Sequence, residues 1–306
     1  MSDLTKTGLK GSVKVCSTER IFFSSDQRSP PSPRTELREL SRVSFDAKGN
    51  LLELWQRNAG GTEWSAVSEY NRAGRLVETR YAGIQYGSDQ AFLYFYDPPD
   101  RLARVDARSR TGDTRVYELH TYGPNREAES ICYPDPASDR SLGIDATNLH
   151  WSPDAVAITT RLDKTGEPME RILYGSDNGI IRRVLFLYDR AGNLIEEGEA
   201  GGGNRIRADF RRVYGYDQAR RRIRAEIICY PFENSVESFF YNDHDDVIET
   251  HTEKHPVDGE DSLSVLRYVY KHDQQYNWIE RVTQASTSSG LSFENTGVEC
   301  RELSYY

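Results

Sequence analysis

The segment YDRAGNLIEE, Tyr188 to Glu197, places an aromatic residue and an acid before a short spacer with Gly-Asn, and two aliphatic residues after it. An Asp side chain at such a position accepts hydrogen bonds from backbone N–H groups two residues further on, and glycine adopts the positive φ of a tight turn. The flanking aromatic and aliphatic residues favour β-strands. The segment therefore predicts the bend of a β-hairpin.

The same pattern recurs along the chain. Seven nine-residue segments align without gaps: FDAKGNLLE (Phe45 to Glu53), YNRAGRLVE (Tyr70 to Glu78), YDPPDRLAR (Tyr96 to Arg104), YDRAGNLIE (Tyr188 to Glu196), YDQARRRIR (Tyr216 to Arg224), YNDHDDVIE (Tyr241 to Glu249) and HDQQYNWIE (His272 to Glu280). Shorter, degraded forms are YGPN at Tyr122 and WSPD at Trp151. The starts at 45, 70, 96, 122 and 151 lie 25 to 29 residues apart, and those at 188, 216, 241 and 272 lie 25 to 31 apart. Such a period is typical of a repeat architecture.

Each repeat predicts two strands, because Gly-rich or polar breaks about midway between the motifs supply a second turn. Seven clear and two degraded units then give about 16 to 18 antiparallel strands. Open sheets of more than about ten strands tend to curl, so we expect an all-β fold with one large curled sheet. We expect a single domain over 1–306, with lead-in strands at 1–44, repeats at 45–280 and a closing hairpin at 281–306.

One stretch does not follow strict alternation. Between Trp151 and Tyr188 the turns KTGEP (Lys164) and GSDNG (Gly175) add one bend more than the repeat allows. An irregular insertion from about Tyr133 to Asn148 belongs to the same region. The strand parity between residues 133 and 188 is therefore left open by the sequence.

The Y-D-x-x-G-[NR]-L pattern resembles the RHS or YD repeats of bacterial rearrangement-hotspot proteins, toxin-complex shells and teneurins. The resemblance spans about Phe45 to Glu280, and YDRAGNLIE and YNRAGRLVE carry it most specifically. The closing run, NWIER (Asn277 to Arg281) followed by RELSYY (Arg301 to Tyr306), is similar to the end of short stand-alone RHS-like proteins. In the large family members a spiral β-sheet shell encloses a toxin domain, which implies a curled antiparallel sheet here.

Composition narrows the class of protein. The formal net charge is −9, which argues against a nucleic-acid surface because phosphate binding requires clustered positive charge. The N-terminal residues lack the apolar stretch of a Sec signal peptide, and no stretch is long enough to span a membrane. We therefore expect a cytoplasmic protein, with export by a specialised secretion system left open. The four cysteines lie far apart without a CxxC motif, which favours free thiols.

A glutamate column occupies one position of the repeat and has two interpretations. Paired carboxylates act as acid and base in glycoside hydrolysis, whereas equivalent positions on stacked strands suggest a solvated ladder of charged pairs. The mixture of Glu and Arg favours the ladder. The column comprises Glu53, Glu78, Glu196, Glu249 and Glu280, with Arg104 and Arg224 at the same position in other units.

An aromatic column opens the motifs and also has two interpretations. Stacked rings with polar tips could bind a glycan, while a ring at each turn mouth is more simply the packing that fixes hairpin register. The candidate ligand-binding residues are Tyr70, Tyr96, Tyr188, Tyr216 and Tyr241.

Histidines gather between residues 244 and 272. Metal ligation needs convergent imidazole and carboxylate groups, and the spacing here matches no HExxH motif. Surface histidines in acidic loops are the favoured interpretation, with His244, His251, His255 and His272 as the candidate metal ligands. No GxSxG or phosphate-binding motif is present, and we expect no cofactor and no catalytic residues.

These features favour a non-enzymatic β-repeat scaffold that presents a curved sheet to a protein or a glycan. One alternative is an immunity or chaperone-like partner of a secreted toxin, in which the acidic surface meets a basic effector. Another is a hydrolase that uses carboxylates or a metal. An exposed sheet edge would also allow two copies to pair as a homodimer.

Overall fold

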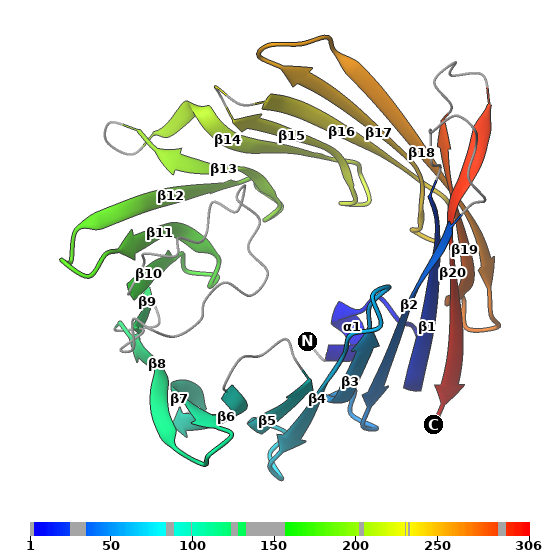
Figure 1. The fold of residues 1–306 in the computed structure, drawn as a ribbon. Helices are drawn as coiled ribbons and strands as arrows, with labels where there is room; N and C mark the ends of the chain where they lie inside the picture. The colour runs from blue at the N-terminus through cyan, green and yellow to red at the C-terminus, as the bar shows by residue number, and fades with distance from the viewer. Residues whose placement is uncertain are drawn as a thin grey trace.

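The chain forms one antiparallel β-sheet that curls into a ring (Figure 1). A one-turn helix, α1 (Asp3–Lys6), precedes the strands, and no helix in the part described is long and apolar enough to cross a membrane. The predicted all-β fold is confirmed. The computed structural model describes residues 3–24, 35–83, 89–98, 100–123, 128–132, 157–201, 205–229, 231, 233–286 and 292–306.

Twenty strands make up the described sheet. The first half contains β1 (Val13–Ser24), β2 (Thr35–Phe45), β3 (Leu51–Arg57), β4 (Glu63–Tyr70), β5 (Leu76–Gly83), β6 (Asp89–Asp97), β7 (Arg101–Ser109), β8 (Thr114–Tyr122), β9 (Ala128–Cys132) and β10 (Ala157–Leu162). The second half contains β11 (Pro168–Tyr174), β12 (Ile180–Tyr188), β13 (Leu194–Ala200), β14 (Ile206–Tyr216), β15 (Arg222–Cys229), β16 (Glu233–Tyr241), β17 (Val247–Pro256), β18 (Ser262–His272), β19 (Trp278–Ser286) and β20 (Phe293–Tyr305).

Strand pairing follows chain order and then returns to its start. Each strand pairs with the next one along the chain, and β1 pairs with both β2 and β20: Cys16 lies opposite Val43 on one side and Leu303 on the other. Twenty strands exceed the predicted 16 to 18 because nine repeat hairpins, β2–β3 through β18–β19, supply two strands each, and β1 and β20 lie outside them. The lead-in region contains α1 as well as strands.

The β1–β20 pairing also bears on self-association. A free lateral edge offers unpaired N–H and C=O groups to a second chain. Each described strand has a partner on both sides, so the sheet has no strand with an entire free side in the part described. The expected pairing of two copies through sheet edges stays a prediction.

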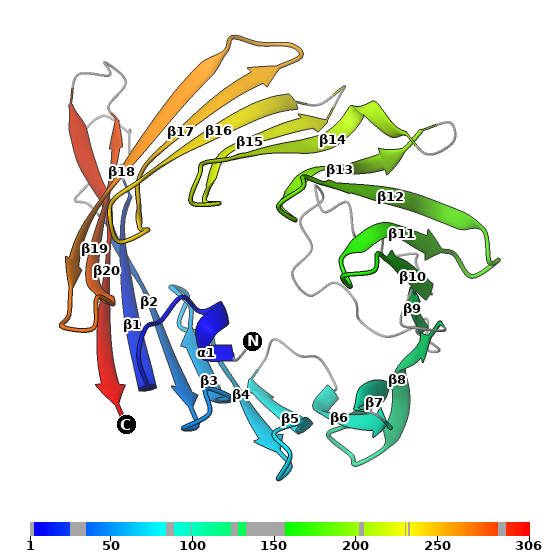
Figure 2. The same cartoon turned by 180° about the vertical axis from the view of Figure 1, so that it is seen from behind.

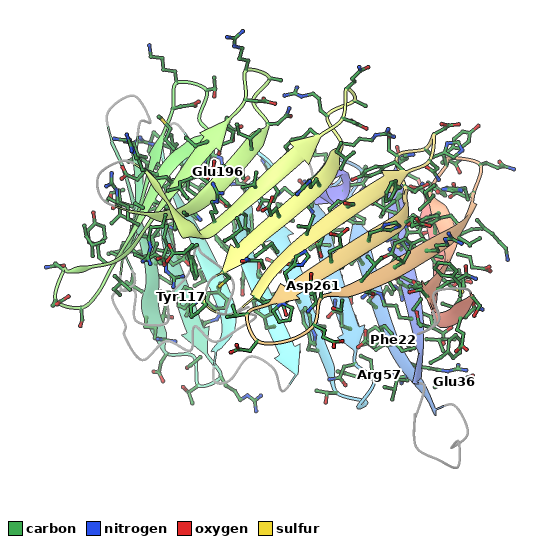
Figure 3. All side chains as sticks on the ribbon, turned by 90° about the horizontal axis from the view of Figure 1, so that it is seen from above. Phe22, Glu36, Arg57, Tyr117, Glu196 and Asp261 are labelled. Carbon is green, nitrogen blue, oxygen red and sulfur yellow. The ribbon has the colours of Figure 1, made fainter. Side chains whose placement is uncertain are left out.

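The alternation of strands gathers the repeat turns on one side of the ring. All seven clear motifs connect an even-numbered strand to the following odd-numbered one, so they lie on one rim, which we call the repeat rim. Turns after odd-numbered strands form the opposite rim. Arg57 at the end of β3 and Asp261 before β18 mark the opposite rim in Figure 3.

The strand parity between residues 133 and 188 is settled for the described part. The turn between β10 and β11 falls on the repeat rim, and Asp163 forms the same bonds there as the motif aspartates: its Oδ1 accepts from Thr165 N at 2.7 Å and from Glu167 N at 3.0 Å. GSDNG lies on the opposite rim, between β11 and β12. The degraded motif at Trp151 and the expected insertion from Tyr133 to Asn148 lie outside the described residues.

The helix α1 identifies the inner face of the sheet, because it lies within the ring in both views of the ribbon (Figures 1 and 2). Leu4 of α1 packs on a buried cluster that includes Cys16 of β1 and Phe45 of β2. Alternate residues of a strand share a face, and directly paired residues of neighbouring strands do as well. The register from Cys16 and Phe45 therefore assigns the remaining strand residues to the inner or the outer face.

Candidate functional site

The repeat turns share one hydrogen-bond pattern. In the β12–β13 turn the Asp189 carboxylate accepts from Ala191 N at 2.8 Å and Asn193 N at 2.9 Å, and Asp189 N donates to Asn193 O at 2.9 Å. Gly192 has a φ of 82°. These amide bonds lower the pKa of Asp189, which identifies the acid as a turn-forming group. The predicted hairpin bend is confirmed.

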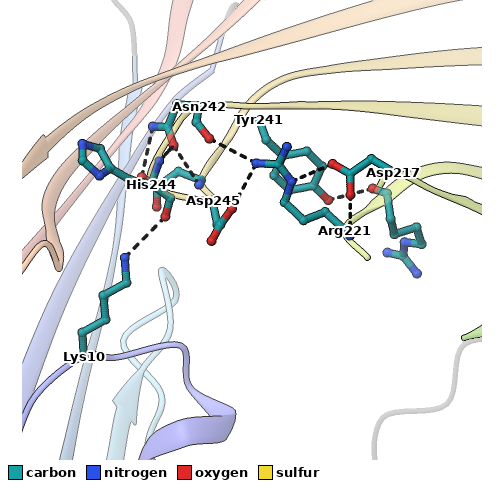
Figure 4. A network of polar contacts seen from close by, with 9 residues as sticks. Lys10, Asp217, Arg221, Tyr241, Asn242, His244 and Asp245 are labelled. Atoms are coloured by element: carbon teal, nitrogen blue, oxygen red, sulfur yellow. Dashed lines mark hydrogen bonds and ion pairs between the residues drawn. The ribbon is translucent and has the colours of Figure 1, made fainter. Parts of the chain in front are cut away.

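Neighbouring repeat turns are also linked to one another (Figure 4). The Arg221 guanidinium donates to Asp217 in its own turn at 2.7 Å and to Asp245 in the next repeat turn at 3.0 Å. It also lies over the Tyr241 ring, 4.9 Å from the centroid. The Lys10 ammonium, inside the ring, donates to His244 O at 3.4 Å. The repeat rim is thus a chain of connected turns.

Two of the candidate tyrosines form hydrogen bonds that join one hairpin to the previous one. Tyr216 Oη donates to Leu194 O at 2.8 Å, and Tyr241 Oη donates to Arg222 O at 2.7 Å. In both cases the acceptor is the first residue of the strand that follows the preceding repeat turn. These hydroxyls therefore serve the structure of the rim.

The other three candidate tyrosines have different surroundings. Tyr70 Oη donates to Asp3 of α1 at 3.1 Å, and the guanidinium of Arg75 lies 5.7 Å from the Tyr96 ring centroid. Tyr188 packs on the buried pair Val184 and Phe186, and burial with nearby carboxylates raises its pKa to about 12. The five rings are distributed along the repeat rim and do not line a common described pocket.

The glutamate column lies on the outer face, where Glu78, Glu196, Glu249 and Glu280 pair with cations, and the arginines at the same repeat position pair with acids. The predicted charge ladder is therefore present. Its measured pairs are Glu196 with Arg211 at 3.2 Å, Glu249 with Arg267 at 2.6 Å, Glu280 with Lys271 at 2.6 Å, Arg224 with Glu226 at 3.3 Å and Arg104 with Asp106 at 3.0 Å, and Glu78 pairs with Arg108. Glu53 lines an outer groove described below.

The four candidate histidines are only partly brought together. His244 and His272 lie with ring centroids 5.3 Å apart, and His272 Nε2 contacts Asp246 at 2.7 Å. His251 contacts Glu249 on the outer face at 2.6 Å, and His255 lies 3.1 Å from Asp261 at the opposite rim. Among the residues that the structure describes, no group of three or more His, Cys, Asp or Glu side chains is arranged to hold a metal.

A charged cluster that the sequence did not indicate lies on the inner face where β19, β20 and β1 meet. Glu299 of β20 is placed directly between Arg20 of β1 and Arg281 of β19 by the strand register. Its carboxylate accepts from Arg20 Nε at 2.9 Å and from Arg281 Nη2 at 2.7 Å. The Glu299 side chain is only 6% exposed, whereas that of Arg20 is 49% exposed. The arginine therefore reaches into the interior of the ring.

A third arginine, Arg301, lies next to this pair. Its guanidinium stacks on the Trp278 ring at 3.3 Å from the centroid, and Arg281 lies 5.1 Å from the same centroid. Burial lowers the pKa of Arg301, with the positive charges of Arg281 and Arg20 acting in the same direction. Burial opposes charge on Arg281 as well, but the Glu299 carboxylate raises the pKa of Arg281. We call Arg20, Arg281, Arg301 and Glu299 the arginine cluster.

Two hollows adjoin the arginine cluster and share Arg20. One has a volume of about 280 Å³, and its inner-face lining includes Phe22, Arg281, Thr283, Gly297 and Glu299. The other has a volume of about 210 Å³, and its inner-face lining includes Thr18, Glu39, Ser41, Gln56 and Trp64. Aromatic, hydroxyl, amide and charged groups therefore converge on one stretch of inner wall over β19, β20 and β1–β4, which we call the inner-wall site.

A larger groove lies on the opposite surface of the same strands. Its volume is about 750 Å³, and its outer-face lining includes Trp55, Leu40, Cys300 and the acids Glu19, Glu53 and Glu302. Arg42 is a basic residue of that lining, and Arg301 of the arginine cluster also borders this groove. Cys300 is a free thiol, as are Cys16 and Cys229, in agreement with the predicted free cysteines among those described. We call this surface the outer groove.

The comparisons with known proteins do not identify the chain. No protein-family model matches it, and no curated protein matches it. Similar solved structures include TcdB2-TccC3 without its hypervariable C-terminal region, with a TM-score of 0.41, 13% identity and coverage of 87% of this chain and 14% of that chain. A porin-like protein from Bacteroides uniformis has a TM-score of 0.40, 8% identity and coverage of 97% and 98%. At TM-scores below 0.5 these similarities assign neither a family nor a function.

Proposed function

We propose that this protein is a non-enzymatic β-repeat scaffold that binds a glycan at the inner-wall site. The observation that carries the proposal is the convergence of Trp64, Gln56, Glu39 and Ser41 on one hollow beside the arginine cluster. A tryptophan ring offers an apolar face to a sugar, and amide, carboxylate and hydroxyl groups supply donors and acceptors for its hydroxyls. Many other polar groups of the described repeats are engaged in turns and ion pairs.

The arrangement of the repeats supports a scaffold role. The turn acids are held by backbone amides, and four of the column glutamates, Glu78, Glu196, Glu249 and Glu280, are paired with arginine or lysine. Groups committed to such bonds lack the free acid and base positions that hydrolysis of a glycoside requires. The repeats thus form most of the curled sheet, and the non-repeat strands β1 and β20 contribute much of the inner-wall site.

The test uses two tryptophans on adjacent strands that point to opposite faces. Trp64 of β4 lies on the inner face, and Trp55 of β3 lies in the outer groove. Binding to an array of glycans, followed by calorimetry with the hits, should show that Trp64→Ala loses most of the affinity while Trp55→Ala retains it. Circular dichroism confirms that both variants remain folded. Equal binding by the wild type and both variants would contradict the proposal.

A second function is favoured by the outer groove. Its three glutamates and Trp55 suit a basic partner protein, because an acidic patch steers a positively charged surface and an aromatic residue anchors it. Such a partner would be a basic effector to which this chain acts as an immunity or chaperone-like protein. A pull-down that recovers a basic protein with the wild type and with Trp64→Ala, but not with Trp55→Ala, would support this second function.

A further inference from the structure

We infer that the arginine cluster recognises the carboxylate of an acidic sugar. This inference rests on the proposed glycan-binding function and specifies the ligand. Arginine is suited to the task because its planar guanidinium matches a carboxylate with two parallel hydrogen bonds. A sugar with a carboxylate at the cluster would extend its neighbouring ring into the hollow at Trp64, since Arg20 lines both hollows.

The local charge favours an anion even though the whole chain is acidic. Three guanidiniums face Glu299, and the register adds Glu39 opposite Arg20, which leaves three positive charges against two negative ones. Glu299 bonds to Arg20 and Arg281. Arg301 instead lies on the Trp278 face, and among the described side chains no carboxylate forms an ion pair with it within 4 Å. Arg301 therefore adds positive charge beside the cluster, although it lines the outer groove and neither of the two hollows, and Arg20 is the arginine that lines both of them.

The hydrogen-bonding capacity of the cluster is also incompletely used. Arg281 Nε, Arg301 Nε and Glu299 Oε1 are buried and have no hydrogen-bond partner among the described residues. Buried polar atoms are normally paired, because leaving one unpaired costs about 1–3 kcal/mol. Three such atoms within one small cluster indicate a place where further polar groups are accommodated. A ligand carboxylate could accept a hydrogen bond from Arg20, which now donates to Glu299. The cluster would then rearrange its hydrogen bonds around the ligand.

The lining of the two hollows favours a sugar over a free oxyanion. Inorganic phosphate would use only the guanidiniums, whereas Trp64, Gln56 and Ser41 lie in the adjoining hollow, where a second ring would sit. The two volumes, about 280 and 210 Å³, also suit a ligand that extends across both. The inferred ligand is therefore a short oligosaccharide with a carboxylated sugar next to a neutral one.

The experiment compares ligands that differ only in the acid. Calorimetry at low and at physiological salt would use a disaccharide of glucuronate and a neutral hexose, its counterpart with glucose in place of glucuronate, free glutamate and inorganic phosphate. We expect the acidic disaccharide to bind at least tenfold more tightly than the neutral one, with weaker binding at higher salt, and glutamate and phosphate to bind less tightly than the acidic disaccharide.

Matched variants complete the test. Arg20→Gln, at the arginine that lines both hollows, should lower affinity for the acidic disaccharide about tenfold and leave the neutral one within twofold, while Arg42→Gln in the outer groove should change neither. Equal affinity for acidic and neutral sugars, or glutamate or phosphate binding as tightly as the acidic disaccharide, would overturn the inference but leave glycan binding standing. Failure of every glycan to bind would overturn the proposed function itself.

Discussion

The two rims of the ring use the same kind of turn but differ in what the turns contact. On the repeat rim the Asp46 carboxylate accepts from Lys48 N and Asn50 N, and on the opposite rim the Asn58 side chain accepts from Thr62 N in the same way. Only a few residues are needed to close either hairpin. The repeat rim then adds links between hairpins, through Tyr216, Tyr241 and Arg221. Local turn chemistry thus makes the hairpins, and the added links hold neighbouring hairpins together on one side.

The largest difference in stability between the two rims is expected from substitution of Asn277, which is 3% exposed and lies at the last repeat turn. Its amide bonds to Lys10 O at 2.8 Å and Tyr305 Oη at 2.9 Å, and its Oδ1 accepts from Lys10 N at 2.6 Å. Asn277→Ala should lower the free energy of unfolding by about 2–4 kcal/mol, because a buried side chain and its partly buried bonds to Lys10 and Tyr305 are lost together. Urea unfolding measures the change. Asn58→Ala, at an exposed turn on the opposite rim, is the control and should cost about 1 kcal/mol or less.

A smaller effect is expected from backbone strain, which both rims share. Gly61 on the opposite rim has a φ of 80°, whereas the adjacent Gly60 lies outside the left-handed region. Gly61→Ala should cost about 1–2 kcal/mol, and Gly60→Ala should be close to neutral. Gly74→Ala on the repeat rim, with a φ of 80°, should match Gly61→Ala. Thermal unfolding of the three variants checks this, and a Gly74 variant without any cost would show that the turns differ.

The hydrogen bonds from the tyrosine hydroxyls to the previous hairpin can be tested one at a time. Tyr216→Phe removes the bond to Leu194 O and should lower stability by about 1 kcal/mol. Tyr188→Phe is the matched control, because that ring packs on Val184 and Phe186 and its hydroxyl makes no hydrogen bond within the described part of the chain. Urea unfolding measures the free energy of unfolding of both variants. Similar losses in both would indicate that the hydrogen bond from Tyr216 to Leu194 does not stabilise the rim.

The smallest effect at neutral pH is expected at the turn acids. Amide hydrogen bonds lower the pKa of Asp189, so it contributes stability that is fully present above the ordinary pKa of an aspartate, about 4, and is lost as pH falls through the lower folded pKa. Asp189→Asn keeps an acceptor, as Asn71 and Asn242 do naturally. The variant should be nearly as stable as the wild type at pH 7 and lose less stability between pH 4 and pH 2. A steeper loss in the variant would reverse this account.

Much of the fold was predictable because each hairpin is encoded locally. The motif acids and glycines fix a turn wherever they occur, and their spacing fixes the strand count to within the two strands outside the repeats. The parity near residue 163 was not predictable, because Leu162 and Pro168 replace the aromatic and the aliphatic residue of the motif while Asp163 and Gly166 keep its turn geometry. A search for the acid and glycine alone would have identified the turn at KTGEP as a repeat turn.

The candidate site was less predictable because it depends on register between strands far apart in the chain. Arg20 and Glu299 are separated by 279 residues and meet only through the β1–β20 pairing. Both faces of the sheet carry aromatic and charged residues, so alternation alone did not show which face was the inner one. The position of α1 inside the ring supplies that information.

The joining of β1 to β20 also has a kinetic consequence. The other neighbouring strands are consecutive along the chain, and hairpins of this kind form rapidly. The β1–β20 pairing must instead bring together segments nearly 300 residues apart. Until β1 pairs with β20, the edges of these two strands are exposed to other molecules. Refolding is therefore expected to be slow in its last step and sensitive to protein concentration, although the completed ring has paired strands at that position.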